Sequence, residues 1–94
     1  YNIYYTMKVF KSTRKGKKYM VIYNNKKIHF GAEGMSDYTI NKDPKRKAAY
    51  IARHRKNEDW TDPTTAGFYS KHILWNTPNS VAYNMRLTEK RFNI

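Results

Sequence analysis

The stretch that decides the fold is Lys18–Phe30, which reads KYMVIYNNKKIHF. Its first half alternates Tyr19, Val21 and Tyr23 with Met20 and Ile22, and this period of two predicts a β-strand. Both faces of the strand are apolar, so we expect it to lie at the centre of a sheet. The pair Asn24-Asn25 predicts a tight turn, because asparagine tolerates a positive φ angle. The chain then returns as another strand over Lys26 to Phe30.

The residues before this hairpin predict one more strand. Tyr4 to Phe10 alternates ring-bearing and branched side chains with polar ones, which is typical of a strand with one buried face. Ser12 to Lys17 is polar and contains Gly16, as expected of a hairpin loop. The sequence therefore predicts a three-stranded antiparallel meander.

The residues after the hairpin predict helices. Asp43-Pro44 is typical of a helix start, because Asp43 can cap free amides and proline needs no donor at the first position. This helix is expected to run to about Asn57 and to bury a narrow stripe made of Lys47, Tyr50, Ile51 and His54. Thr65 is expected to cap a second helix through Trp75, and Thr77-Pro78 to open a short third one that contains Val81, Ala82 and Met85.

These elements predict an α+β fold: a small three-stranded meander followed by one main basic helix and two shorter helices. We expect residues 1–94 to form a single small domain, with tail-like extensions in residues 1–16 and 77–94. The chain has no cysteine, which excludes disulfide frameworks and thiolate metal sites. Its apolar runs are too short for a membrane-spanning helix or a signal peptide.

The charge balance indicates what the chain can bind. Nineteen Lys and Arg face seven Asp and Glu, for a net charge of +12, and such a surface attracts polyanions. Four candidate residues for polyanion binding lie around the predicted hairpin loop and four on the main helix: Arg14, Lys15, Lys17, Lys18, Lys45, Arg46, Arg53 and Arg55. The alternative is a solvated surface that only keeps the protein soluble.

Two modes of nucleic-acid binding are compatible with this pattern. Tyr19 and Tyr23 alternate with cations along a strand, where they could stack on unpaired bases. The main helix could instead enter a major groove, with Arg46, Arg53 and Arg55 reading bases or phosphates. The same pattern also describes an amphipathic helix whose outer face is simply wet.

A cluster of rings in the last third of the chain has two interpretations. It is expected either to form the core that holds the helices together or to offer an exposed anchor for a protein partner. A domain this small cannot bury all fifteen of its aromatic side chains, so the two interpretations are compatible. The residues concerned are Trp60, Phe68, Tyr69 and Trp75.

The sequence contains few indications of catalysis or metal binding. His54 and Glu58 share a helix face and could hold a divalent metal together with His72, but zinc needs three or four such ligands. A hydrogen-bonded histidine on a packing face is the commoner outcome, so we predict no metal site and no cofactor. Phosphate-binding glycine loops and nucleophile motifs are absent, and the carboxylates are too few for a nuclease-type cluster. We therefore expect a protein that is not an enzyme and has no small-molecule substrate.

Two long motifs resemble a known family. They are FGAEGMSDYTINKDPKRKAAYIARHRKNEDW at residues 30–60 and TAGFYSKHILWN at residues 65–76. The chain is similar, over about residues 17–76, to an uncharacterised family of small basic proteins of large double-stranded DNA viruses of algae and protists. The family has no assigned activity, so the resemblance implies a viral origin and supplies no functional residues.

That origin implies a virion component. The leading hypothesis is a non-enzymatic structural protein, a minor capsid or cement component that contacts neighbouring capsid proteins, located in the virion and in the host cell during assembly. The alternative is a basic nucleic-acid-binding protein that acts on viral DNA. A salt titration of DNA binding distinguishes the two hypotheses, because phosphate contacts release counterions.

Overall fold

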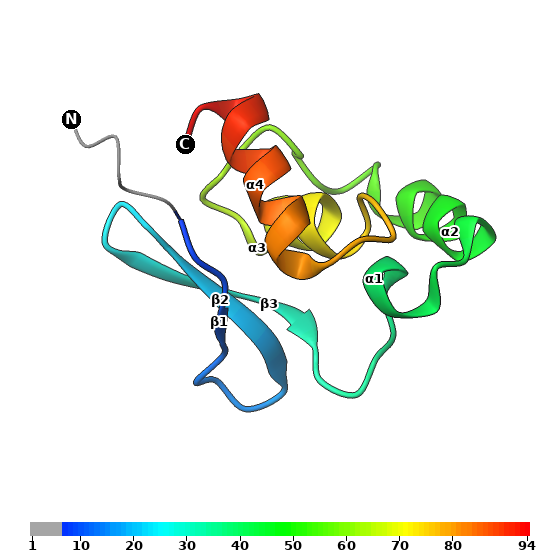
Figure 1. The fold of residues 1–94 in the computed structure, drawn as a ribbon, viewed down its shortest axis with the longest axis horizontal. Coiled ribbons are helices and arrows are strands. Elements are labelled where there is room, and N and C mark those ends of the chain that lie inside the picture. The colour runs from blue at the N-terminus through cyan, green and yellow to red at the C-terminus, as the bar shows by residue number, and fades with distance from the viewer. Residues whose placement is uncertain (1–6) are drawn as a thin grey trace.

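The computed structural model describes residues 7–94, in which helices pack against one side of a three-stranded antiparallel sheet (Figure 1). The strands follow one another in the order β1-β2-β3, with β1 spanning Phe10–Lys11, β2 Lys17–Tyr23 and β3 Lys26–Ala32. The predicted α+β class and the antiparallel meander are thereby confirmed.

The central hairpin forms as its sequence predicts. Asn24 and Asn25 adopt φ angles of 50° and 64°, so both lie in the left-handed region that a two-residue hairpin turn requires. Met20 pairs with His29 and Val21 with Ile28, which sets the register of β2 against β3. This register decides which side chains share each face of the sheet.

The first strand is shorter than predicted. Of the expected span, residues 4–6 lie outside the described residues, and residues 7–9 are not part of the sheet. Instead, the Met7 amide donates to the Glu89 carboxylate over 2.6 Å, and the Arg86 guanidinium donates to the Met7 carbonyl. The backbone at Met7 is therefore held by the C-terminal helix rather than by β2, and pairing begins only at Phe10.

The main helix begins where the sequence predicts. Helix α2 spans Pro44–His54, and the Asp43 side chain accepts from the Lys45 amide over 2.9 Å. Tyr50 is buried, and the other positions of its predicted stripe are half-buried. A four-residue helix that the sequence analysis missed, α1 (Tyr38–Asn41), precedes it and is capped by Asp37.

The remaining helices build the core. Helix α3 (Ala66–Tyr69), capped by Thr65 as predicted, continues as a π-helical turn, η1 (Ser70–Leu74). Helix α4 spans Val81–Phe92 and is capped by Ser80, so the expected cap at Thr77-Pro78 is wrong. The Thr77 hydroxyl instead donates to the buried Asn84 side chain on α4.

The C-terminal region is not a tail. The α4 residues Asn84, Met85 and Thr88 are fully buried, so the expectation of a tail-like extension over residues 77–94 is wrong for this helix. A helix that supplies core side chains cannot leave the fold without exposing them.

The core lies between the sheet and the helices α3, η1 and α4. Its centre comprises Val21, Ile28, Phe30, Phe68, Tyr69, Ile73, Leu74 and Met85. At Gly31 the strand and η1 approach closely: φ is +79°, and a Cβ atom there would lie 2.9 Å from Leu74 Cδ1. Within residues 7–94, no helix combines the length and the apolar character that crossing a membrane demands.

Candidate functional site

The two faces of the sheet differ in what covers them. Val21, Ile28 and Phe30 point toward the helices and are buried. The half-buried Tyr19 and Tyr23 pack against this core, and the Tyr19 ring lies 5.9 Å from that of Phe30. These two tyrosines therefore face the helices, and their stacking on unpaired bases stays a prediction.

The opposite face, which we call the outer sheet face, consists of Phe10, Met20, Ile22, Lys27 and His29. Register places Phe10 and His29 on either side of Met20, and Lys27 beside Ile22. Among residues 7–94, none of the helices covers this face, and Phe10 and Ile22 are 42% and 38% exposed, whereas Met20 is only 9% exposed. Large apolar side chains left uncovered on a sheet indicate a contact surface.

Cations surround this face. Burial, together with the charges of Arg14, Lys27 and Lys17, lowers the pKa of His29 below its ordinary value of 6.5. The imidazole is therefore neutral at pH 7, and its Nδ1 lies 2.8 Å from the Ser12 hydroxyl. The contact between Ser12 and His29 therefore places the start of the β1–β2 loop beside the outer sheet face.

Of the four candidates at this hairpin, Arg14 and Lys15 lie in the β1–β2 loop (residues 12–16), and Lys17 and Lys18 begin β2. They separate into two groups by exposure. Arg14, Lys15 and Lys17 are exposed. The side chain of Lys18 is only 14% exposed, and its Nζ lies 2.8 Å from the buried Asp37 carboxylate. Lys18 is thus a structural residue whose charge is already compensated, and it contributes little to the binding of a polyanion.

The four candidates on α2 and at its C-terminal cap are all exposed: Lys45, Arg46, Arg53 and the cap residue Arg55. Arg53 and Lys17 line one cleft of about 350 Å³ between the sheet and α2, so the structure brings these two candidates together. The floor of the cleft includes Tyr50 and Trp75, whose rings stack with centroids 4.7 Å apart. The remaining cations of α2 do not line this cleft.

The carboxylates are largely engaged in local contacts. Asp43 caps α2, Asp59 and Asp62 accept from Thr61 and Thr64 within their own turns, and Glu89 pairs with Arg86. All charged side chains lie within residues 7–94, and in that part of the chain Lys18 and Arg86 are the only Lys or Arg residues with a salt bridge.

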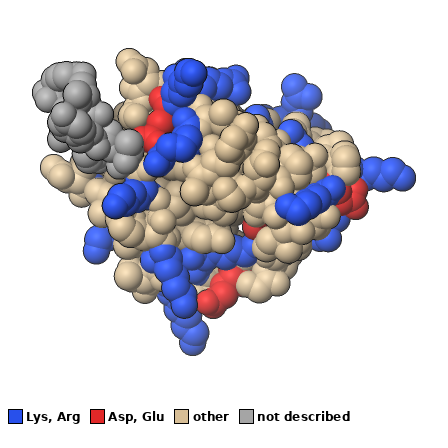
Figure 2. All heavy atoms as spheres, in the orientation of Figure 1, with Lys and Arg blue, Asp and Glu red and all other residues tan. Residues whose placement is uncertain are grey.

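The excess of positive charge therefore remains on the surface. Figure 2 shows Lys and Arg side chains projecting from the edges of the visible face, with few acidic atoms among them. A column of cations extends from the lower edge, where the β1–β2 loop lies in Figure 1. A potential of this sign attracts anionic partners over the distance set by ionic screening.

The four ring-bearing candidates are mainly core residues. Phe68 and Tyr69 have no exposed surface, so they cannot contact a partner in this structure. Trp60 and Trp75 are half-buried; the Trp60 indole donates to Glu58 over 2.8 Å, and Trp75 stacks on Tyr50. The core interpretation holds for Phe68 and Tyr69, and an interface role stays a prediction for the two tryptophans.

The histidines are held by hydrogen bonds. His54 Nδ1 lies 2.7 Å from the Glu58 carboxylate, and His72 Nε2 lies 2.8 Å from the Trp60 carbonyl. Burial lowers the pKa of His72 to about 4, so this imidazole is neutral at pH 7. No set of three His, Asp or Glu side chains in residues 7–94 is arranged to hold a metal ion.

Sequence reasoning missed the residues that define the outer sheet face. Phe10, Lys27 and His29 come from three different positions in the meander, and only the strand register places them on one surface. The available signal was the alternation in Lys18–Phe30: if Val21 and Ile28 are buried, Met20 and His29 must lie on the other face.

The fold and this surface define a small basic α+β protein with one uncovered, cation-rich sheet face. The chain belongs to DUF5754, a family of unknown function whose model matches residues 7–54. The match includes the whole sheet and α2, and therefore the outer sheet face and the β1–β2 loop. No curated protein and no solved structure matches the chain.

Proposed function

We propose that this protein binds nucleic acid, without catalysing a reaction, through the outer sheet face and the β1–β2 loop. One observation carries the proposal: an uncovered sheet face holds exposed apolar side chains beside cations that have no carboxylate partner within residues 7–94. Nucleic acid offers both a dense row of phosphates and apolar base surfaces, and this face complements both.

The cationic and the apolar side chains contribute to binding in different ways. Arg14, Lys15 and Lys17 neutralise phosphates and release counterions, which gives most of the affinity. Phe10 and Ile22 contact sugars or bases, where burial of apolar surface adds a contribution that salt does not screen. The major groove admits a two-stranded antiparallel ribbon, and the β2–β3 hairpin is such a ribbon.

The assay is fluorescence anisotropy with a labelled DNA duplex and a labelled single strand of the same sequence. The variant F10S/I22S removes the apolar part of the outer sheet face. We expect weaker binding, by about tenfold for the loss of about 1.4 kcal/mol, with an unchanged salt slope because no charge is removed.

Tyr83 and Leu87 provide the matched control. Both are exposed, at 48% and 36%, and they lie on α4 rather than on the sheet. The variant Y83S/L87S should bind DNA like the wild type. Equal losses in both variants, or no binding by the wild type at physiological salt, would refute the proposal.

A second candidate function is a virion structural role, as a minor capsid or cement protein that contacts capsid proteins. The observation that favours it is the pair Tyr83 and Leu87, one helical turn apart on the exposed side of α4. Together with the viral resemblance, this pair supports a protein contact. Mass spectrometry of purified particles of the encoding virus tests it, and absence of the protein from the particles would refute it.

A further inference from the structure

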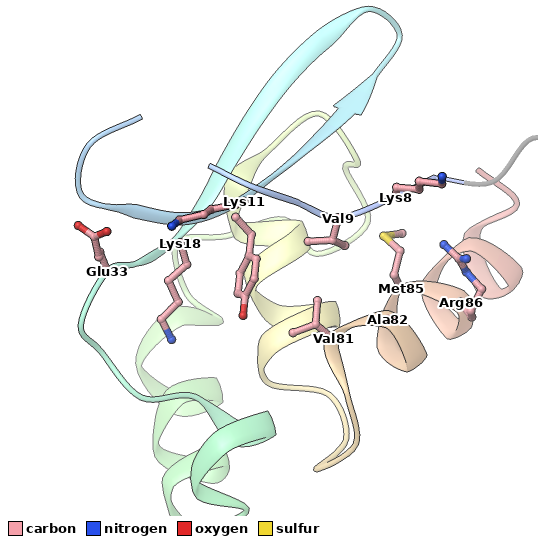
Figure 3. A pocket seen from close by; sticks show the side chains of 10 residues that line it. Lys8, Val9, Lys11, Lys18, Glu33, Val81, Ala82, Met85 and Arg86 are labelled. Atoms are coloured by element: carbon pink, nitrogen blue, oxygen red, sulfur yellow. The ribbon is translucent and has the colours of Figure 1, made fainter. Parts of the chain in front are cut away.

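A groove of about 710 Å³ opens between the N-terminal segment 8–11 and α4, away from the outer sheet face. Figure 3 shows the side chains of Val9, Val81 and Met85 directed into it. Tyr19 and Ala82 complete the apolar lining. The volume lies in the range of sites that bind a ligand or an anchoring side chain of a partner.

The rim of the groove is mainly cationic. Lys8 and Lys11 flank Val9 on the strand side, and both are exposed and without a salt bridge in the described chain. Arg86 on α4 is partly engaged by Glu89, at 2.6 Å. The one acidic group, Glu33, lies at the same end of the groove as Lys11 and Lys18, whereas Lys8 and Arg86 lie at the opposite end (Figure 3).

The apolar lining and the mainly cationic rim together select the occupant. We propose that the groove binds an acidic peptide segment of a partner protein, with an apolar side chain inserted between Val9, Val81 and Met85 and carboxylates beside Lys8 and Lys11. This site is separate from the proposed nucleic-acid surface and does not depend on it.

Charge and chemistry argue against the other occupants. A second copy of the chain also carries +12, so two copies repel each other at this rim. A nucleic-acid base would place its polar edge against the apolar lining without hydrogen-bond partners, which is costly. An acyl chain would stay partly in water, because the groove is open to solvent.

The probe is a short fluorescent peptide of alternating glutamate and leucine, measured by anisotropy with the full chain. Two control peptides separate the contributions: one has glutamine in place of glutamate, and the other is polyglutamate, which lacks the apolar anchor. The acidic peptide should bind more tightly than both. Equal binding of the glutamine peptide, or no binding of the acidic one, would overturn the proposal.

Variants locate the binding in the groove. Ala82 is exposed at its edge, so A82W fills the groove and should weaken peptide binding by at least about tenfold. K8S/K11S should weaken it by about fivefold, as expected for two solvent-exposed ion pairs. The matched control is A52W, at an exposed alanine on α2.

The outcomes are distinguishable. Loss of peptide binding in A82W with unchanged DNA binding supports a separate peptide site, and urea unfolding confirms that the variant is folded. Equal losses of peptide binding in A82W and A52W would overturn the assignment of the peptide to this groove. A dimer that A82W dissociates in sedimentation, or binding of anionic vesicles that A82W abolishes, would assign the groove to a different occupant and also overturn the proposal.

Discussion

Replacing the exposed cations Arg14 and Lys15 of the β1–β2 loop and Lys17 at the start of β2 tests the nucleic-acid surface most directly. In the variant R14S/K15S/K17S, Lys18 is kept, because its ammonium is bonded to Asp37 and its loss would perturb the fold. The other three side chains are exposed, so their loss should change the free energy of unfolding by no more than about 0.5 kcal/mol each. The effect on binding is therefore separable from stability.

The expected magnitude follows from counterion release. Each phosphate that a cation neutralises contributes about 0.9 to the slope of log K against log salt concentration, so removing three such cations reduces the slope by up to about 2.7. The assay is anisotropy with a labelled duplex at several salt concentrations. Affinities of the variant and the wild type should converge as the salt concentration rises.

The comparison variant is K45S/R46S/R55S, which removes the same charge from α2 and its C-terminal cap residue. If the loop contacts phosphates, the slope falls in the loop variant and much less in the α2 variant. Equal reductions would show that only the net charge matters, and an unchanged slope in the loop variant would refute the role of the loop. A reduction confined to the α2 variant would move the contact surface to that helix.

Three further predictions concern the fold. Burial lowers the pKa of His72 to about 4, so the stability that depends on its neutral form is complete above about pH 6.5 and is lost as the pH falls toward 4, by up to about 3 kcal/mol. Urea titrations of the wild type and H72Q at several pH values should show this pH dependence in the wild type alone. Parallel plots of unfolding free energy against pH for the two proteins would contradict it. D37A leaves the Lys18 ammonium without a partner and should lower the free energy of unfolding by about 3 to 5 kcal/mol. The double variant K18M/D37A should lose less than the sum of the losses in K18M and D37A, which a double-mutant cycle of urea unfolding measures. Both Gly16 and Gly31 have positive φ, so an alanine costs about 1 to 2 kcal/mol at either position; G31A should be the more destabilising in thermal unfolding, since only its Cβ meets Leu74, and equal losses would contradict the close approach.

Local signals account for the parts of the fold that were predicted correctly. The β2–β3 hairpin depends on alternation and on two asparagines at the turn, and α2 on Asp43 and Pro44 at its start. In each case the deciding residues are neighbours in sequence, so no tertiary information is needed. The same holds for the cap at Thr65.

The errors come from interactions between distant residues. The alternation of Tyr4 to Phe10 predicts a long strand, but Glu89 and Arg86 bind the backbone at Met7. Thr77-Pro78 has the pattern of a helix start, yet Asn84 engages the Thr77 hydroxyl and Ser80 provides the cap. A partner that is many residues away leaves no trace in a local pattern.

The sequence alone determined the excess of positive charge, the central hairpin and the main helix, because composition and short-range pattern suffice for these. Only the tertiary structure decided which Lys and Arg side chains pair with a carboxylate and which stay in solvent. Lys17 and Lys18 are neighbours in sequence, but the fold places a buried carboxylate against Lys18 and leaves Lys17 in solvent. It also decided that Phe10, Ile22 and His29 share one uncovered face, since strand register and packing are properties of the folded chain.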